Sequence, residues 1–261
     1  MDNAHMTTLL DWTENELFGT PTGVDIAKHA PDLTAPDAYR LNAALVLRRV
    51  AQGDTHIGYK IASGASGIRA ETDEPRQHVV GSLMRSGLFA GPDPVPFGTA
   101  SKMVVEAEVA VLLKRDLQGP RLTMADVIGA VEGYFPAIEI VPSTGGPRGS
   151  HLSRIVSSKF TGGIVLGNAL HAPHGIDLQL EGAIMRVNGE PMATATGVVI
   201  MGNPLTAVAA IANQLAEIGV GLKAGMVLMT GTFTGTTPVK PGDFVEAAFT
   251  RLGSATARFV A

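Results

Sequence analysis

Two glutamates, Glu106 and Glu108, stand in the otherwise apolar run of residues 104–113, VVEAEVAVLL. This valine-rich run predicts a β-strand, and side chains two residues apart on a strand share a face, so both carboxylates project together. Neighbouring carboxylates in apolar surroundings repel each other and lose hydration, so they need a shared proton, a basic side chain or a metal ion. Mg²⁺ and Mn²⁺ prefer oxygen ligands and would meet that need. The alternative is a solvent-exposed strand face on which both glutamates are hydrated.

A third carboxylate, Glu139, lies in a second apolar run, residues 136–141 (PAIEIV). Three carboxylates on two short strands are able to hold one divalent ion and leave positions open for a substrate. Lys60 stands in the middle of another apolar run, residues 57–62 (IGYKIA). It is either a lysine at an edge or surface, or a cation directed at an anionic ligand.

Composition narrows the classes of function. The chain has 261 residues, a net charge of −4 and no cysteine, which argues against a nucleic-acid partner and excludes a thiol nucleophile or a cysteine-ligated metal. It shows neither a secretory pattern at its start nor an apolar run of about 20 residues, so we expect a cytoplasmic protein without a membrane partner. A hydrophobic content of 45% with only 17% charged residues indicates much buried surface, including surface between subunits.

Capping signals place two long helices. Thr34 as N-cap and Gly53 as a stop predict a helix over residues 35–51. The clearest helical periodicity covers residues 204–219, with apolar residues at helical spacing and a glycine at the end.

Two further local signals are short. Thr123 with Asp126 three residues later resembles a capping box and predicts a helix through about Tyr134. Asn188-Gly189 is a strong signal for a two-residue hairpin turn.

Taken together, these stretches resemble the 2-hydroxypenta-2,4-dienoate hydratase family, which includes 4-oxalocrotonate decarboxylases and belongs to the fumarylacetoacetate hydrolase superfamily. The resemblance extends from about residue 30 to the end of the chain, and the order and spacing of its motifs are specific. The motifs, in chain order, are residues 58–61 (GYKI), 105–110 (VEAEVA), 136–139 (PAIE), 202–205 (GNPL), 222–225 (LKAG), 230–234 (TGTFT) and 241–243 (PGD).

The resemblance implies an α+β fold: a mixed β-roll core with a smaller N-terminal helical part, divided near residues 1–70 and 71–261 but forming one compact unit. It implies Mg²⁺ or Mn²⁺ held by the matches to Glu106, Glu108 and Glu139. It also implies a homo-oligomer of microbial aromatic-compound catabolism, with a small 2-oxo or 2-hydroxy unsaturated acid as its partner molecule.

The family pattern also assigns substrate contacts. Lys60 matches a strand lysine that binds the substrate carboxylate or moves a proton. The loop that meets the substrate carboxylate through hydroxyls and backbone amides matches Thr230, Gly231, Thr232 and Thr234.

The chain departs from the family in two places. Where the family carries Ala-Asp-Asn-Ala-Ser, this chain has residues 157–161, SSKFT, so that Lys159 replaces a neutral amide and Thr161 keeps a hydroxyl that can bind substrate. The family also has an acidic residue after the proline of a preceding loop, and here His78, Asp73 or Glu74 would have to substitute for it as the general base.

Lys159 has two interpretations. It binds a second carboxylate of the substrate, which favours a dienedioate, or it pairs with a nearby glutamate or faces solvent. The candidate catalytic residues are therefore Lys60, His78, Lys159 and Thr161.

A metal-bound 2-oxo acid can be hydrated, decarboxylated or cleaved through the same stabilised enolate. The leading expectation is a metal-dependent hydratase that adds water to a 2-hydroxy-alka-2,4-dienoate and yields a 4-hydroxy-2-oxo acid. Two alternative enzymatic reactions are decarboxylation of a 2-oxo-enedioate and hydrolysis of an acylpyruvate-type C–C bond. The alternative to an enzyme is an inactive paralogue that binds a ligand or a partner subunit.

Overall fold

The computed structural model describes residues 3–18, 24–62, 78–90, 93–98, 100, 102–143, 150–157 and 162–261. The α-helices are α1 (Asn3–Phe18), α2 (Ile26–His29), α3 (Ala35–Ala51), α4 (Met124–Ile128), α5 (His151–Ser157) and α6 (Pro204–Ala216). The strands are β1 (His56–Ala62), β2 (Val79–Met84), β3 (Leu88–Ala90), β4 (Pro94–Pro96), β5 (Lys102–Leu113), β6 (Val131–Ser143), β7 (Gly163–Leu166), β8 (Gly182–Val187), β9 (Glu190–Thr196), β10 (Val227–Met229), β11 (Thr237–Val239), β12 (Phe244–Phe249) and β13 (Gly253–Val260).

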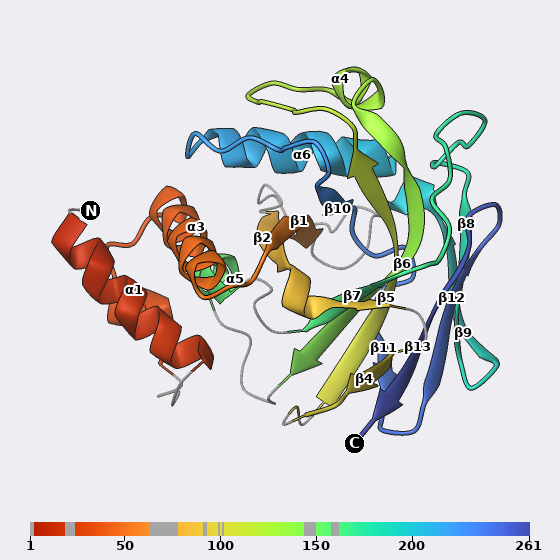
Figure 1. The fold of residues 1–261 in the computed structure, drawn as a ribbon, viewed down its shortest axis with the longest axis horizontal. Coiled ribbons are helices and arrows are strands. Elements are labelled where there is room, and N and C mark those ends of the chain that lie inside the picture. Colours follow the sequence, from red (N-terminus) through yellow and green to blue (C-terminus); the bar gives the residue numbers. More distant parts are fainter. Residues whose placement is uncertain are drawn as a thin grey trace, which may run out of the picture.

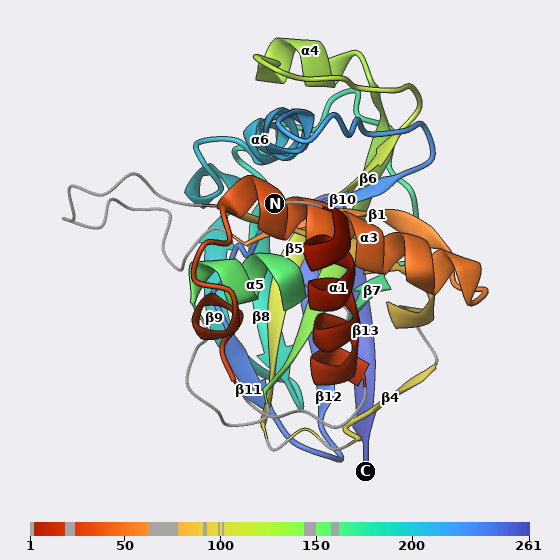
Figure 2. The ribbon, with the colours of Figure 1, turned by 90° about the vertical axis from the view of Figure 1, so that its left-hand side faces the viewer.

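These strands form two mixed sheets. The first has the order β2-β1-β10-β5-β6-β7-β3, with β11 also paired to β5, and the second has the order β4-β13-β12-β8-β9. Helices α1, α3 and α5 lie together beside the first sheet, while α6 and α4 cover one end of the strands (Figure 1). The view from the side of α1 places the N-terminal helices in front of both sheets (Figure 2). The α+β expectation, a mixed β core with a smaller N-terminal helical part, is confirmed.

Local sequence explains the helix boundaries. The Thr34 hydroxyl accepts a hydrogen bond from the Asp37 amide at the start of α3, and Gly53 adopts a φ of 98° just after its end. Thr123 and Asp126 form the expected capping box, but α4 ends at Ile128. The expectation of a helix through Tyr134 is wrong, because the chain enters the long strand β6 at Val131.

The turn at Asn188-Gly189 is confirmed as the β8–β9 hairpin. Both residues have positive φ, 54° and 88°, which is the conformation of a type I′ turn.

The apolar stretch Gly197–Ala216 is long and hydrophobic enough to cross a membrane by composition, yet half of it is buried inside the molecule. Within it, α6 packs against α4 and β1. Asn203 caps this helix by accepting a hydrogen bond from the Leu205 amide. The stretch therefore has the burial and contacts of a core helix.

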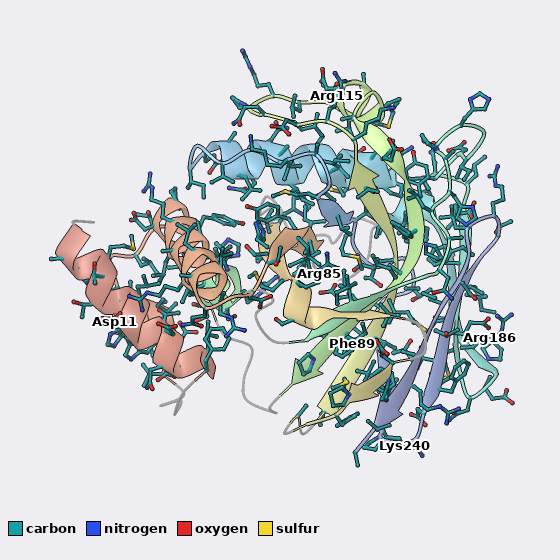
Figure 3. All side chains as sticks on the ribbon, in the orientation of Figure 1. Asp11, Arg85, Phe89, Arg115, Arg186 and Lys240 are labelled. Carbon is teal, nitrogen blue, oxygen red and sulfur yellow. The ribbon has the colours of Figure 1, made fainter. Side chains whose placement is uncertain are left out.

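Hydrophobic side chains fall into two clusters. The larger fills the space between the two sheets and beneath the helices, and charged side chains such as Arg115, Arg186 and Lys240 lie at the periphery (Figure 3). The smaller lies on the other face of the first sheet, the face that also carries Lys60 and the glutamates, and it consists of Leu83, Ala110, Ala137, Ile164, Val227 and Met229.

Candidate metal centre and active site

Strand register brings the three glutamates together. Glu106 on β5 pairs with Glu139 on β6, and Glu108 pairs with Ala137, so all three side chains share one face of the sheet. One ligand oxygen from each glutamate lies within 4.8 Å of the others. Glu108 is 0% exposed and Glu139 is 3% exposed, so the alternative of a hydrated strand face is wrong for these two residues.

Lys60 completes the group of charges. It pairs with Met229 of β10, which in turn pairs with Ala110 of β5. Lys60 therefore lies on the same face as the glutamates, two strands away from those of β5 and three from the one on β6. Its Nζ lies 3.7 Å from Oε1 of Glu139, and the residue is only 5% exposed. The interpretation of Lys60 as a surface lysine is therefore wrong.

Gly58 positions Lys60 and was not recognised as a site residue in its own right. A Cβ at Gly58, which has a φ of 152°, would lie 1.9 Å from the carbonyl oxygen of Val227. Only glycine permits this approach of β1 to β10, which fixes the register of Lys60 beside Met229. The signal available in the sequence was a glycine inside an apolar strand.

The electrostatics of the centre favour a cation. Three carboxylates and one ammonium leave two negative charges when all are ionised. Burial raises the pKa of Glu108 well above its usual value, and the charges of Glu139 and Glu106 act in the same direction, while the Gly231 amide opposes them. The Glu108 Oε1 atom is buried without a hydrogen-bond partner among the described residues.

This donor set fits a divalent metal ion. Three carboxylates supply the oxygen ligands that Mg²⁺ and similar hard cations prefer, and the unbonded Oε1 of Glu108 is available for coordination. The other oxygen, Oε2, accepts a 2.9 Å hydrogen bond from the Gly231 amide, which orients the carboxylate.

In the loop after β10, the threonine hydroxyls expected to meet the substrate donate hydrogen bonds to backbone carbonyls instead. Thr230 is fully buried and its hydroxyl donates a 2.9 Å hydrogen bond to the Val109 carbonyl. The hydroxyls of Thr232 and Thr234 donate to the Gly235 carbonyl at 3.2 Å and 3.4 Å and remain half-buried. The Gly231 amide bonds to Glu108, so this loop directly supports the candidate metal centre.

Of the remaining candidate site residues, only one lies within the described residues. His78 precedes Gly81, the β2 partner of Lys60, by three residues, or about 10 Å along an extended strand. Its carbonyl accepts a hydrogen bond from the Tyr39 hydroxyl. The residues Asp73, Glu74, Lys159 and Thr161 lie outside the described residues.

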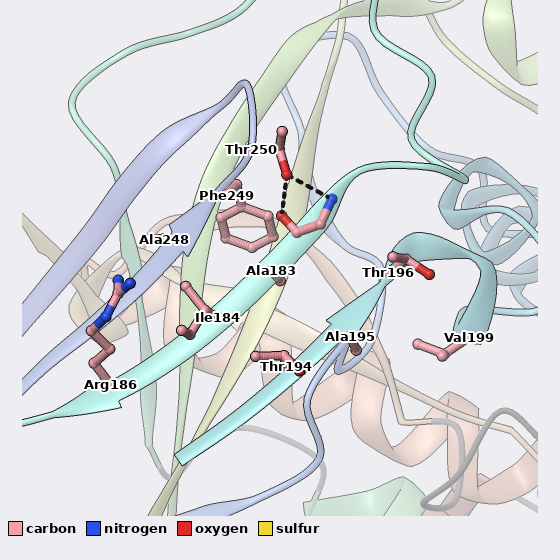
Figure 4. A pocket seen from close by; sticks show the side chains of 11 residues that line it. Ala183, Ile184, Arg186, Thr194, Ala195, Thr196, Val199, Ala248, Phe249 and Thr250 are labelled. Carbon is pink, nitrogen blue, oxygen red and sulfur yellow. Dashed lines mark hydrogen bonds between the residues drawn. The ribbon is translucent and has the colours of Figure 1, made fainter. Parts of the chain in front are cut away.

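A separate pocket of about 800 Å³ lies on β8, β9 and β12 (Figure 4). Its described lining is mostly small and neutral, and the one cation in that lining, Arg186, forms a 3.0 Å ion pair with Glu246. The glutamate centre, not this pocket, gathers the ionisable groups that chemistry requires.

The fumarylacetoacetate (FAA) hydrolase C-terminal family model matches residues 56–260. The chain is 31% identical over 232 residues to the 2-keto-4-pentenoate hydratase of Paraburkholderia xenovorans, covering 88% of this chain and 85% of that protein. It is 32% identical over 236 residues to the 4-oxalocrotonate decarboxylase of Pseudomonas putida, covering 88% and 87%.

Among solved structures, the chain superposes on 4-oxalocrotonate decarboxylase from Pseudomonas putida G7, complexed with magnesium and adipate, with a TM-score of 0.88 and 28% identity. That match covers 100% of this chain and 99% of the other. The same decarboxylase complexed with calcium and acetate gives a TM-score of 0.86.

Proposed function

Because this chain belongs to the fumarylacetoacetate hydrolase family, we propose that it is a metal-dependent hydratase of a 2-hydroxy-alka-2,4-dienoate. The product is a 4-hydroxy-2-oxo acid, formed by net addition of one water molecule. The observation that carries the proposal is the group of half-buried Glu106 and buried Glu108 and Glu139, with Lys60 beside it. Hydratases among the relatives support this reaction within the family.

The three glutamates would hold the divalent ion. Mg²⁺ is favoured because the donor set consists of carboxylates, and a solved relative contains magnesium; Mn²⁺ is the alternative from the same ligand preference. When bound, the ion supplies a Lewis acid that stabilises negative charge at the 2-oxygen of the substrate.

The chain's own residues would bind and orient the substrate. The Lys60 ammonium, held at 3.7 Å from Glu139, attracts the substrate carboxylate or exchanges a proton at Nζ. The Gly231 amide fixes the Glu108 carboxylate, and the half-buried hydroxyls of Thr232 and Thr234 retain the capacity to accept hydrogen bonds from substrate or water. Glu108 itself is 0% exposed, so its carboxylate is shielded from bulk water.

His78, which is described, and two residues beyond the described part would complete the proton transfers and substrate contacts. We assign His78, just before β2, as a candidate base, Lys159 as a candidate for contact with a second carboxylate of the substrate, and Thr161 as a candidate substrate-binding hydroxyl. Thr230 keeps its place in the proposed substrate loop through its backbone, since its hydroxyl is bonded to Val109.

Decarboxylation of a 2-oxo-enedioate is the second candidate. A TM-score of 0.88 to a 4-oxalocrotonate decarboxylase supports it, and the same enolate stabilisation would serve it. Acylpyruvate-type C–C hydrolysis and an inactive binding paralogue are weaker candidates.

The experiment supplies freshly generated 2-hydroxypenta-2,4-dienoate and, in parallel, 2-oxo-enedioate to the purified protein with Mg²⁺. The hydratase proposal expects loss of dienol absorbance with stoichiometric 4-hydroxy-2-oxo acid. CO₂ release from the enedioate with no hydration of the dienol would instead identify a decarboxylase. No turnover of either, with metal bound, would identify a binding paralogue.

We also propose that the protein is a cytoplasmic homo-oligomer and that residues 1–70 and 71–261 form one compact unit. The pairing of β1 with β10 supports the single unit, because it places a strand from the first part inside the sheet of the second.

A further inference from the structure

A second cavity lies behind the strand that carries Lys60. It has a volume of about 280 Å³ and is lined by residues of α3, β1, β2, the end of α6 and the segment that follows α6. Tyr59 lines it and belongs to the main hydrophobic cluster, whereas the next residue, Lys60, contacts Glu139 on the opposite face of the sheet. The cavity is therefore separate from the glutamate centre.

Most polar groups in this cavity are already hydrogen-bonded. The Tyr39 hydroxyl accepts from the Val80 amide at 3.2 Å and donates to the His78 carbonyl at 3.4 Å. The Ser82 hydroxyl donates to Oδ1 of Asn42 at 2.9 Å. The Asn42 amide donates in turn to the carbonyls at the end of α5.

Two polar groups in the cavity are left without a hydrogen bond to the described residues. Tyr59 is 8% exposed, and burial raises its pKa to about 12 with no hydrogen bond of its hydroxyl among the described residues. His56 also lines the cavity, and its Nε2 is buried without a hydrogen-bond partner in the described part of the chain. The two rings stand edge to face with centroids 4.7 Å apart, so these two side chains are neighbours in the lining of the cavity.

These observations define the chemistry of an occupant. An apolar cavity of roughly 150 Å³ accommodates benzene, so this larger cavity has room for one substituted ring. The described lining contains no Asp, Glu, Lys or Arg, which favours an uncharged molecule. A hydroxyl both donates and accepts, so it satisfies the Tyr59 hydroxyl together with either tautomer of His56.

We propose that this cavity is a second small-molecule site, which takes a neutral monocyclic compound with one hydroxyl group directed at Tyr59 and His56. The site requires neither the metal nor the substrate, and its apolar walls, including Val46 and Leu215, contact the ring.

The test measures phenol and toluene binding by calorimetry or ligand-observed NMR on the full-length protein with Mg²⁺ removed by a chelator. The two probes have similar shapes and differ in the hydroxyl. We expect both to bind, and Tyr59→Phe to weaken phenol about tenfold while toluene changes less than about twofold. Ala43→Phe, which adds a ring to the lining, should abolish binding of both.

The matched control is Tyr134→Phe, since Tyr134 is also buried but lines a different pocket. It should leave phenol binding unchanged. Phenol binding that Tyr59→Phe does not weaken would overturn the proposal, as would failure of both probes to bind the unaltered protein. If that failure accompanied a change of oligomeric mass in Ala43→Phe, the cavity would belong to a contact between copies of the chain.

Discussion

Glu106 and Glu139 face each other directly across the antiparallel β5–β6 ladder. Like charges at such positions destabilise a sheet, and the cost increases when the neighbouring Glu108 is fully buried. Lys60 at 3.7 Å from Glu139 offsets only part of that charge. The sheet thus carries an electrostatic strain that a divalent cation would relieve.

Replacing Glu108 with Gln tests that relationship through stability. We expect Mg²⁺ at 100 times its dissociation constant to stabilise the unaltered protein by about 2.7 kcal/mol, and to give the variant little or no stabilisation. Without metal, the variant should be at least as stable as the unaltered protein, because a neutral amide removes the charge repulsion. Thermal unfolding with and without Mg²⁺ measures both effects.

Glu132→Gln is the matched control, since Glu132 lies on the same strand as Glu139 but is exposed. It should retain the full response to Mg²⁺. Equal stabilisation of Glu108→Gln and the control would remove Glu108 from the metal centre.

Lys60→Met should lower kcat/KM by about 100-fold or more, because it removes the buried cation beside the substrate position. Its unfolding temperature should change by only a small amount, so that the loss of activity does not come from unfolding. Steady-state kinetics and thermal unfolding of the same preparation make the comparison. An unchanged rate would limit Lys60 to neutralising Glu139.

Two threonines of the loop after β10 should respond differently to replacement by valine. Thr230→Val removes a buried hydrogen bond to Val109 and should cost about 1 kcal/mol of stability with little change in KM. Thr232→Val removes a half-buried hydroxyl and should raise KM with little change in stability. Denaturant unfolding and kinetics of both variants test the assignment; the reverse pattern would contradict it.

Asp25 makes stability depend on pH in the acid range. Burial tends to raise its pKa, but hydrogen bonds from Ser150, Ala27 and Ser153 outweigh burial and lower the pKa to about 2, from an ordinary value of 3.8. A lowered folded-state pKa contributes stability above the unfolded-state pKa, and that contribution is lost as the pH falls from 3.8 through about 2.

Asp25→Asn should therefore lower stability by about 1 kcal/mol at neutral pH, and this difference should shrink below pH 3.8 and disappear as the pH falls through about 2. Asp177→Asn serves as control, because Asp177 also accepts a local backbone hydrogen bond but is exposed. Urea unfolding across this pH range gives the result; a difference independent of pH would contradict the role of the Asp25 charge.

Much of the centre was predictable because its signals are local. The alternation of Glu106 and Glu108 in a valine-rich run fixed a shared strand face, and the apolar neighbours of Glu139 indicated a second buried strand. A capping residue similarly located α3, and helical periodicity located α6, which ends at Ala216, three residues before the expected stop at Gly219.

The features of the site that the sequence did not predict depend on contacts between segments that are distant in the chain. The hydrogen bond from Gly231 to Glu108 joins residues 123 positions apart and follows from the β10–β5 register, which no local pattern encodes. Gly58 likewise owes its importance to the approach of Val227. At α4, strand formation from Val131 overrode a helix that its capping box had correctly started.

The central claim is that the three glutamates make this chain a metal-dependent hydratase. The most direct measurement follows 2-hydroxypenta-2,4-dienoate and its product in one reaction, with the protein first stripped by a chelator and then titrated with Mg²⁺. The account predicts no hydration above the metal-only blank in the stripped protein or in Glu108→Gln, and restoration of 4-hydroxy-2-oxo acid formation by Mg²⁺ in the unaltered protein alone. Full hydration after exhaustive chelation, or in Glu108→Gln, would contradict it.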